Sequence, residues 1–304
     1  MEKIITTSEI NLGISESAQE FILKSERAVT DQIESIANKI ISDGSESKPL
    51  ILISGPSGSG KTTVASMLSD MVRSKGYNIC YISMDSYFKG FNDVEKRLKS
   101  ENKIDLESPE RLDAEFLNSE LKRLIDGQSI HVAEYDFSTN TRVMTDRLIN
   151  RNGGFVVVEG IHALNPAVLG QKDSFSERIY ASVRTRVVDS EGDKLHPSKI
   201  RLLRRMLRDK LFRDRTIEET IMMYHSVEMG EQNYILPYKC RAHFQIDTFL
   251  AYEPAIYRTF LPKLRELSGE LPEVVDIVRA LDELLPLGTE HIPSGALMRE
   301  FIGG

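Results

Sequence analysis

The hydrophobic pattern of this chain divides it into short apolar runs and longer stretches with helical spacing. Residues 50–53, 79–82 and 155–158 are unbroken apolar runs, and runs this short predict buried strands. Further strands are expected at 130–135, 179–183 and 244–246. Helical spacing predicts helices at 62–75, 110–125 and 197–212, and from 216, 254 and 272 onward. Strands that alternate with helices predict an α/β fold whose parallel sheet is covered by helices on both faces.

The two ends of the chain are predicted to be helical additions to this core. An apolar stripe with helical spacing is formed by Ile22, Val29, Ile33, Ile36 and Ile40. We expect residues 1–48 to form an N-terminal helical extension, 49–250 the main domain and 251–304 a C-terminal helical extension of the same domain. The stripe favours a helix that packs on its own domain, and a dimer contact is the alternative.

Composition and charge narrow the class of protein. The 304 residues are 40% hydrophobic and 28% charged, which is typical of a globular protein, and the net charge of −7 disfavours a broad nucleic-acid surface. Two cysteines make no disulfide framework and fit a reducing cytosol. No apolar run approaches the roughly 18 residues of a membrane span, and the acidic N-terminus lacks the apolar core of a signal peptide. We therefore expect a cytoplasmic protein without nucleic-acid or membrane partners. A homo-oligomer is compatible with the sequence.

The segment 55–62 reads GPSGSGKT and matches the phosphate-binding loop pattern G-x-x-x-x-G-K-[ST]. It follows a predicted strand and opens a predicted helix, so that backbone N–H groups and the helix dipole would face an anion. The predicted nucleotide contacts are Gly55, Ser57, Gly58, Ser59, Gly60, Lys61, Thr62 and Thr63. Lys61 would reach the β- and γ-phosphates and Thr62 would ligate Mg²⁺, so ATP and Mg²⁺ are the expected ligands.

Polar side chains follow three further predicted strands. Asp85, Tyr135 and Glu159 stand at or just beyond strand ends, where parallel sheets bind ligands. Asp85 could accept the proton of an acceptor hydroxyl, and Glu159 could hold Mg²⁺ beside Thr62. Asp85 also counts as a candidate metal ligand. The alternatives are a capping aspartate and an exposed strand-end glutamate.

The segment 201–215 is the most basic part of the chain. Arg201, Arg205 and Arg208 would share one face of a helix. Guanidinium groups suit phosphate oxygens and the charge on a transferring phosphoryl group, so we expect a lid at about 197–230 that closes over phosphates. A solvated basic helix face is the alternative.

Taken in order, these motifs resemble the uridine kinase and phosphoribulokinase family of P-loop kinases. The residues that carry the resemblance are GPSGSGKT, SMDSYF, DLESPERLD, YDFSTNTR, VVVEG, LLRRMLRD and FRDR. They cover about residues 48–250 and are most similar to the bacterial uridine kinase-like members. The resemblance implies a P-loop NTPase-type parallel sheet and an ATP-dependent kinase of small molecules.

The resemblance also implies roles for individual residues. Asp85 matches the catalytic base, with Lys61 and Arg208 in the catalytic set. Arg208 and Arg213 match arginines that face the ATP phosphates. The implied substrate contacts are Asp85, Tyr87, Glu107 (with Asp105 as the other candidate), Tyr135, Phe137, Asn140, Arg142, Arg205 and Arg215.

Two positions depart from the uridine kinase pattern. Asn140 stands where those kinases have a histidine, and Met223 stands where they have a glutamine. An asparagine can still donate to a pyrimidine carbonyl, but a methionine cannot replace an amide. The expected reaction is phosphorylation of the 5′-hydroxyl of a nucleoside, uridine or cytidine. The alternatives are another small alcohol such as a sugar phosphate or pantothenate, and a nucleotide-binding regulatory module with little turnover.

Overall fold

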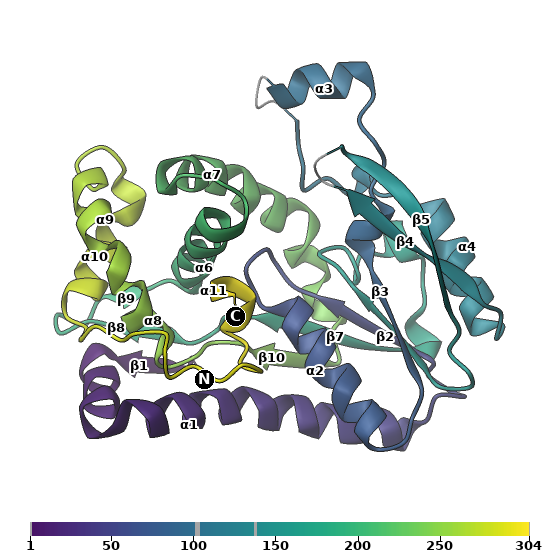
Figure 1. Cartoon of the computed structure of the whole chain (residues 1–304), viewed down its shortest axis with the longest axis horizontal. Helices are drawn as coiled ribbons and strands as arrows, with labels where there is room; N and C mark the ends of the chain where they lie inside the picture. Colours follow the sequence, from purple (N-terminus) through teal and green to yellow (C-terminus); the bar gives the residue numbers. More distant parts are fainter. Residues whose placement is uncertain (1, 101–103, 137–138, 304) are drawn as a thin grey trace.

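The core of the computed structural model is a sheet of five parallel strands (Figure 1). The structure describes residues 2–100, 104–136 and 139–303. In spatial order the strands are β10 (Phe244–Asp247), β7 (Ser176–Ser182), β2 (Leu50–Ser54), β6 (Phe155–Glu159) and β3 (Ile79–Ser83). All neighbouring pairs are parallel. The predicted α/β fold with a parallel sheet is confirmed.

Helices surround this sheet. The α-helices are α1 (Thr7–Asp43), α2 (Lys61–Ser74), α3 (Asp93–Ser100), α4 (Ala114–Ile125), α5 (Pro166–Leu169), α6 (Pro197–Phe212), α7 (Ile217–Tyr234), α8 (Glu253–Ile256), α9 (Leu261–Leu267), α10 (Val275–Asp282) and α11 (Arg299–Ile302). Short 3-10 helices lie at η1 (Met84–Tyr87), η2 (Pro109–Arg111), η3 (Asp173–Phe175), η4 (Leu236–Arg241), η5 (Tyr257–Phe260) and η6 (Pro272–Val274).

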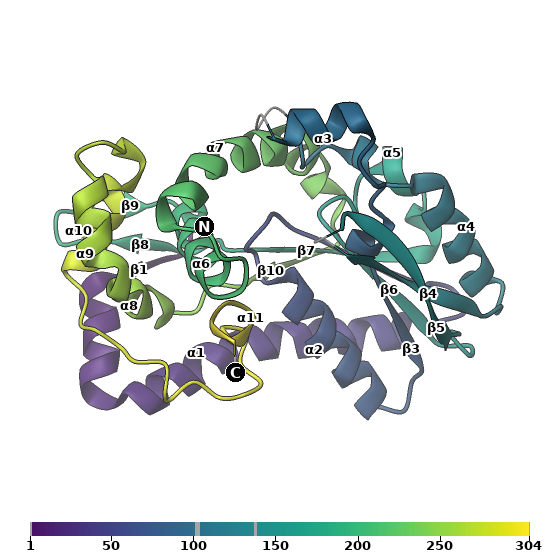
Figure 2. The same ribbon diagram turned by 45° about the horizontal axis from the view of Figure 1, so that its top comes forward.

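Side chains of the central strand β2 are divided between two hydrophobic clusters. Ile51 and Ile53 join the cluster that contains the apolar residues of α1 and α2, whereas Leu50 and Leu52 join the one that contains those of α4. Because successive side chains of a strand point to opposite faces, a run that is apolar at every position needs cover on both faces. Figures 1 and 2 show α1 and α2 together on one side of the sheet and α4 on the other.

The strand predicted at 130–135 does not belong to the parallel sheet, which corrects the sequence analysis. It is β4 (Ile130–Asp136), which pairs antiparallel with β5 (Thr141–Ile149) in a separate two-stranded sheet. Ile130 is buried while His131 is exposed, so β4 has one wet face. A strand with one wet face suits a hairpin on the surface and not a sheet covered on both sides. Tyr135 therefore lies on this hairpin and not at the end of a parallel strand.

Two further elements differ from expectation. The helix predicted from residue 110 begins at Ala114, because Asp113 caps it by accepting the N–H of Phe116 at 3.2 Å. A three-stranded sheet of β1 (Ile4–Thr6), β8 (Arg186–Val188) and β9 (Lys194–Leu195) was not predicted. Strands this short leave little periodic signal in a sequence.

Helix α1 is longer than its apolar stripe. It begins at a capping box formed by Thr6 and Glu9, bends at Ser17, and ends at Gly44, whose φ is +82°. The five residues of the stripe are all buried in the cluster that also contains α2. The stripe thus packs on the core of its own chain.

Within the part of the chain that the structure describes, we find no helix with both the length and the apolar character of a membrane span.

Candidate active site

The phosphate-binding loop joins β2 to α2 and is shaped by glycines. Gly58 and Gly60 have φ angles of +76° and +79°, a region that favours glycine. A Cβ atom on Gly58 would also come within 3.0 Å of the Arg201 carbonyl oxygen. Helix α2 starts directly after Gly60, so its first N–H groups, which have no partner within the helix, lie at the loop. This geometry can hold a phosphate chain.

Lys61, Thr62 and Glu159 meet beside the loop. The Lys61 ammonium lies 3.5 Å from Glu159 Oε1, and the Thr62 hydroxyl donates to the same oxygen at 3.3 Å. Tyr81 on β3 donates to Glu159 Oε2 at 3.1 Å. Burial raises the pKa of Glu159, although the Lys61 charge acts in the opposite direction. The carboxylate is thus fixed at the end of β6, next to the start of α2.

The same residues fit a magnesium ion. Mg²⁺ prefers oxygen ligands and is bound by one or two protein groups together with substrate phosphates and water. A hydroxyl from Thr62 and a carboxylate from Glu159, side by side at a phosphate-binding loop, provide such a donor set. The candidate metal residues Thr62 and Glu159 are therefore brought together.

Asp85 lies in η1, directly after β3, and is exposed. Burial lowers the pKa of Lys61, but the charges of Glu159, Asp85 and Glu300 outweigh it and raise this pKa above its usual value. Asp85 is therefore within electrostatic reach of the loop lysine. An exposed carboxylate in this position can meet a hydroxyl that approaches from solvent.

Of the two carboxylates considered for the sugar hydroxyls, Glu107 is the one on which the charges of Arg205 and Lys61 act. Burial raises its pKa, while Arg205 and Lys61 act against that shift. Asp105 is instead occupied by Tyr234, whose hydroxyl donates to it at 2.9 Å. Glu107 thus lies within electrostatic reach of Lys61 and Arg205.

The first half of the basic helix α6 packs against the phosphate-binding loop. Arg201 donates to the Ser57 carbonyl at 3.3 Å, Arg204 to the Gly58 carbonyl at 3.2 Å, and Arg205 to the Ser57 hydroxyl. These arginines are at most 4% exposed. The solvated-face alternative is therefore wrong for this half of the segment.

Positive charge is crowded at Arg205. Burial and the charge of Arg208 lower the pKa of Arg205 to about 10, against the opposite effect of Asp209 and Glu107. A cation whose pKa is lowered in this way would be stabilised by an added anion. The arrangement is therefore suited to bind phosphate.

Asp209 forms ion pairs with the arginines of the second half of the basic segment. Its carboxylate is 0% exposed and lies 2.8 Å from Arg208, 3.4 Å from Arg213 and 3.6 Å from Arg215. Arg205 therefore contacts the loop directly, whereas Arg208, Arg213 and Arg215 are held by Asp209 toward the end of α6. Their assignment to the ATP side or the substrate side remains a prediction.

The residues expected to hold a nucleoside lie mainly on the β4–β5 hairpin and its support. The Tyr135 ring meets Phe88 edge to face at 5.8 Å, and its hydroxyl donates to the Lys89 carbonyl at 3.4 Å. Asn140 lies at the hairpin turn with a φ of +56°. Met223 lies on α7 and is half-buried. Phe137 lies outside the described residues.

Two other expected substrate contacts are placed in supporting positions. Arg142 pairs with Asp113 at 2.9 Å and lies 4.4 Å from the centre of the Phe116 ring. Tyr87 is only 2% exposed and packs against the same ring. The structure thus places Tyr87 in the hydrophobic core, which corrects its expected role as a substrate contact.

The sequence analysis missed His162, which fixes the Glu107 segment. Its Nε2 lies 2.9 Å from the Glu107 carbonyl oxygen, and burial lowers its pKa to about 4. The residue follows the VVVEG motif by two positions, but a lone histidine there gives no recognisable signal. Tyr81, Arg204 and Glu300 were also missed, because each depends on a contact between distant segments. Asp209 was missed as well, although its arginine partners are close in the sequence.

We expect His162 to make the stability of the protein depend on pH. A base whose pKa falls from 6.5 when unfolded to about 4 when folded favours the unfolded state as pH falls through that range. The loss in free energy of unfolding between pH 7 and pH 5 is about 2 kcal/mol from this group. Urea unfolding of wild type and His162→Gln at both pH values measures it. Equal pH dependence in the two proteins would contradict the prediction.

Comparison with known proteins agrees with this geometry. The family described as "Phosphoribulokinase / Uridine kinase family" matches residues 50–251. A uridine kinase of Macrococcus caseolyticus is 34% identical over 190 residues, which cover 62% of this chain and 81% of that protein. A uridine kinase of Staphylococcus aureus (strain JH9) is 32% identical over 181 residues, 59% of this chain and 76% of that one. The structure titled YGR205w protein shares the fold at 15% identity with a TM-score of 0.51, covering 73% of this chain and 95% of that one.

Proposed function

The chain belongs to the phosphoribulokinase/uridine kinase family, and from this premise we propose that it transfers the γ-phosphoryl group of ATP to the 5′-hydroxyl of a pyrimidine nucleoside, uridine or cytidine. The observation that carries the proposal is the convergence of Lys61, Asp85 and Glu159 at the phosphate-binding loop. Relatives named uridine kinase support a nucleoside as the acceptor.

Each of these residues has a part in the proposed reaction. Asp85 accepts the proton of the acceptor hydroxyl. The oxygen of that hydroxyl forms the new bond to the γ-phosphorus, while the bond from this phosphorus to the bridging oxygen of ADP breaks. Lys61 and Arg205 stabilise the negative charge on the phosphoryl oxygens. Thr62 and Glu159 would hold Mg²⁺, which neutralises charge on the phosphates when bound. Glu107 would accept hydrogen bonds from the sugar hydroxyls and so orient the acceptor.

The proposal is tested by a coupled assay of ADP release over nucleosides, sugar phosphates and pantothenate. Uridine or cytidine should give the highest kcat/KM, and ATP hydrolysis without an acceptor should be slow, because a closed site excludes water. A sugar phosphate or pantothenate as the best acceptor would overturn the nucleoside assignment. Acceptor-free hydrolysis as fast as the best transfer would overturn the kinase assignment.

We expect Met223→Gln, alone or with Asn140→His, to raise kcat/KM for uridine. The new side chains can hydrogen-bond a base edge, and each such bond corresponds to roughly a two- to tenfold gain. Steady-state kinetics with uridine measures the effect. Met222→Gln is the matched control, because Met222 is the neighbour on α7 and is 66% exposed. A gain in the control equal to that in the variant would contradict a direct contact with the base.

A further inference from the structure

The C-terminal end of the chain lies against the phosphate-binding loop, far from the family motifs. Helix α11 sits beside α2 and α6 in both views of the fold (Figures 1 and 2). A Cβ atom on Gly60 would come within 3.2 Å of the Leu297 side chain. Residues 297–301 therefore form part of the wall around the loop.

Glu300 binds the start of α2. Its Oε2 accepts a hydrogen bond from the Thr63 N–H at 3.2 Å and another from the Thr63 hydroxyl at 2.6 Å. Thr63 is the third residue of the helix, so its N–H has no partner within the helix. A carboxylate is stabilised there by the positive end of the helix dipole. In a nucleotide complex, N–H groups at this position bind phosphate oxygens.

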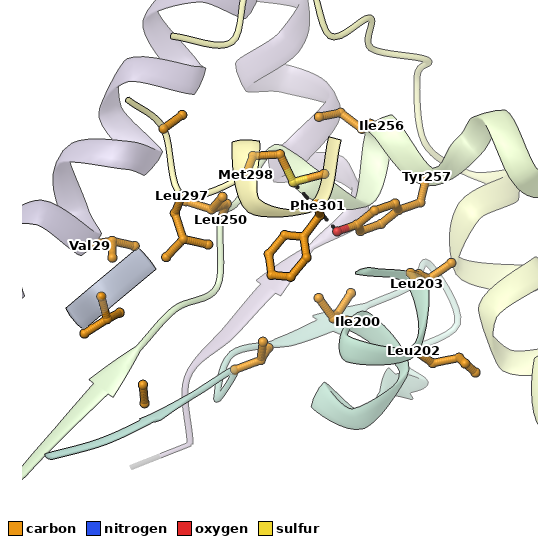
Figure 3. Close-up of a cluster of buried hydrophobic side chains, with 14 of the residues drawn as sticks. Val29, Ile200, Leu202, Leu203, Leu250, Ile256, Tyr257, Leu297, Met298 and Phe301 are labelled. Atoms are coloured by element: carbon orange, nitrogen blue, oxygen red, sulfur yellow. Dashed lines mark hydrogen bonds between the residues drawn. The ribbon is translucent and has the colours of Figure 1, made fainter. Parts of the chain in front are cut away.

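The backbone that carries Glu300 is firmly anchored. Figure 3 shows Leu297, Met298 and Phe301 among buried side chains that include Leu250, Tyr257 and Ile200. Leu297, Met298 and Phe301 are 0% exposed, and Leu297 N–H donates to Glu26 at 3.0 Å. Arg204, which binds the loop, lies 4.9 Å from the centre of the Phe301 ring. The Glu300 side chain is half-buried and is not part of this apolar cluster, so it can turn away without disturbing the packing.

We propose that Glu300 is a built-in competitor of the nucleotide, because its carboxylate occupies the N–H and hydroxyl of Thr63 that a donor phosphate would bind. The inference rests on the proposed function only in that the loop binds a nucleoside triphosphate. One N–H and one hydroxyl cannot serve both anions fully, and the two negative charges repel each other. Binding of the donor therefore requires the Glu300 side chain to leave Thr63, which lowers the affinity for nucleotide.

The test is equilibrium binding of Mg·ATP by calorimetry, without an acceptor, to wild type, Glu300→Gln and Glu300→Ala. Both variants should bind ATP about tenfold more tightly, the factor expected for one hydrogen bond to a charged group. Glu290→Gln is the matched control, because Glu290 is exposed in the same terminal segment, and it should bind as wild type does. Magnesium tripolyphosphate, which has no ribose or base, should show the same gain.

The second measurement is the thermal stability of the nucleotide-free protein, which should fall in the Glu300 variants although their affinity for ATP rises. Without nucleotide, the Glu300 variants should unfold at a lower temperature than wild type, because the start of α2 loses its anionic partner. The rise in midpoint on adding saturating ATP should be larger than in wild type, since ligand affinity for the folded state sets that rise. Together these results separate competition from a general change in stability.

Four outcomes would overturn the inference. Unchanged affinity in both variants would make Glu300 a helix cap only, and weaker binding would make it a partner of the nucleotide. A gain for ATP but none for tripolyphosphate would place the effect at the ribose or base. Failure of wild type and variants alike to bind any nucleoside triphosphate would overturn the proposed function as well.

Discussion

Replacing Lys61 by alanine is expected to lower phosphoryl transfer by at least about 10³-fold, the lower end of what one cation at a transferring phosphoryl group supplies. Lys61 is the loop cation closest to the end of β6, 3.5 Å from Glu159. The raised pKa of Lys61, to which Glu159, Asp85 and Glu300 contribute against the effect of burial, keeps it charged at neutral pH. The measurement is the initial rate of ADP release with the best acceptor from the screen.

The control for this variant is Lys75→Ala. Lys75 follows the opposite end of α2, where it makes a long surface ion pair of 3.9 Å with Glu34, and we expect wild-type activity from the Lys75→Ala variant. The change leaves Glu159 without its cation, so folding of the variant must be checked. We expect circular dichroism to show that Lys61→Ala remains folded. A folded Lys61→Ala protein with near wild-type turnover would show that this loop is not the donor site.

Replacing Asp85 by asparagine is expected to lower kcat by at least about 10²-fold, the low end of general-base contributions, with ATP affinity changed little. The substitution keeps the size of the side chain and removes its ability to take a proton. Asp85 is exposed at the end of β3, so the change leaves the core intact. Steady-state kinetics and calorimetric titration with ATP together measure both parts of the prediction.

Asp70→Asn serves as the matched control for Asp85. Asp70 is an exposed aspartate on α2 whose partner is Arg73, three residues away at 2.9 Å. We expect this variant to keep both kcat and ATP affinity. If Asp85→Asn instead loses ATP affinity and keeps kcat, Asp85 acts as a metal ligand and not as the base.

The family of this protein, its phosphate-binding loop and the residues Asp85 and Glu159 could be predicted from the sequence, because they depend on contiguous segments. The phosphate-binding loop is one strand, one turn and one helix in succession, and its glycines specify the backbone of the turn. Glu159 and Asp85 follow from the rule that parallel strands bring their carboxyl ends to one edge. The structure indeed brings Glu159 and Lys61 together.

Errors arose where the prediction depended on which strands pair. The run 130–135 is apolar enough to predict a strand, but nothing within that run indicates which strand it pairs with. Its partner β5 is largely exposed and mixes charged with apolar residues, so no periodic signal marked it. Pairing in a hairpin is decided by the turn and by which face can be covered, and this moved Tyr135 away from the parallel sheet.

The sequence by itself determined the parallel α/β core, the phosphate-binding loop and the family. Only the tertiary structure decided what surrounds the loop: Arg204 bridges Gly58 and Glu253, and Glu300 reaches Thr63 across 237 positions of the chain. The physical reason is that hydrophobic periodicity and turn chemistry act over a few residues. Contacts between distant segments depend instead on how the whole core packs, and side chains such as Glu300 carry no local pattern that reveals their partner.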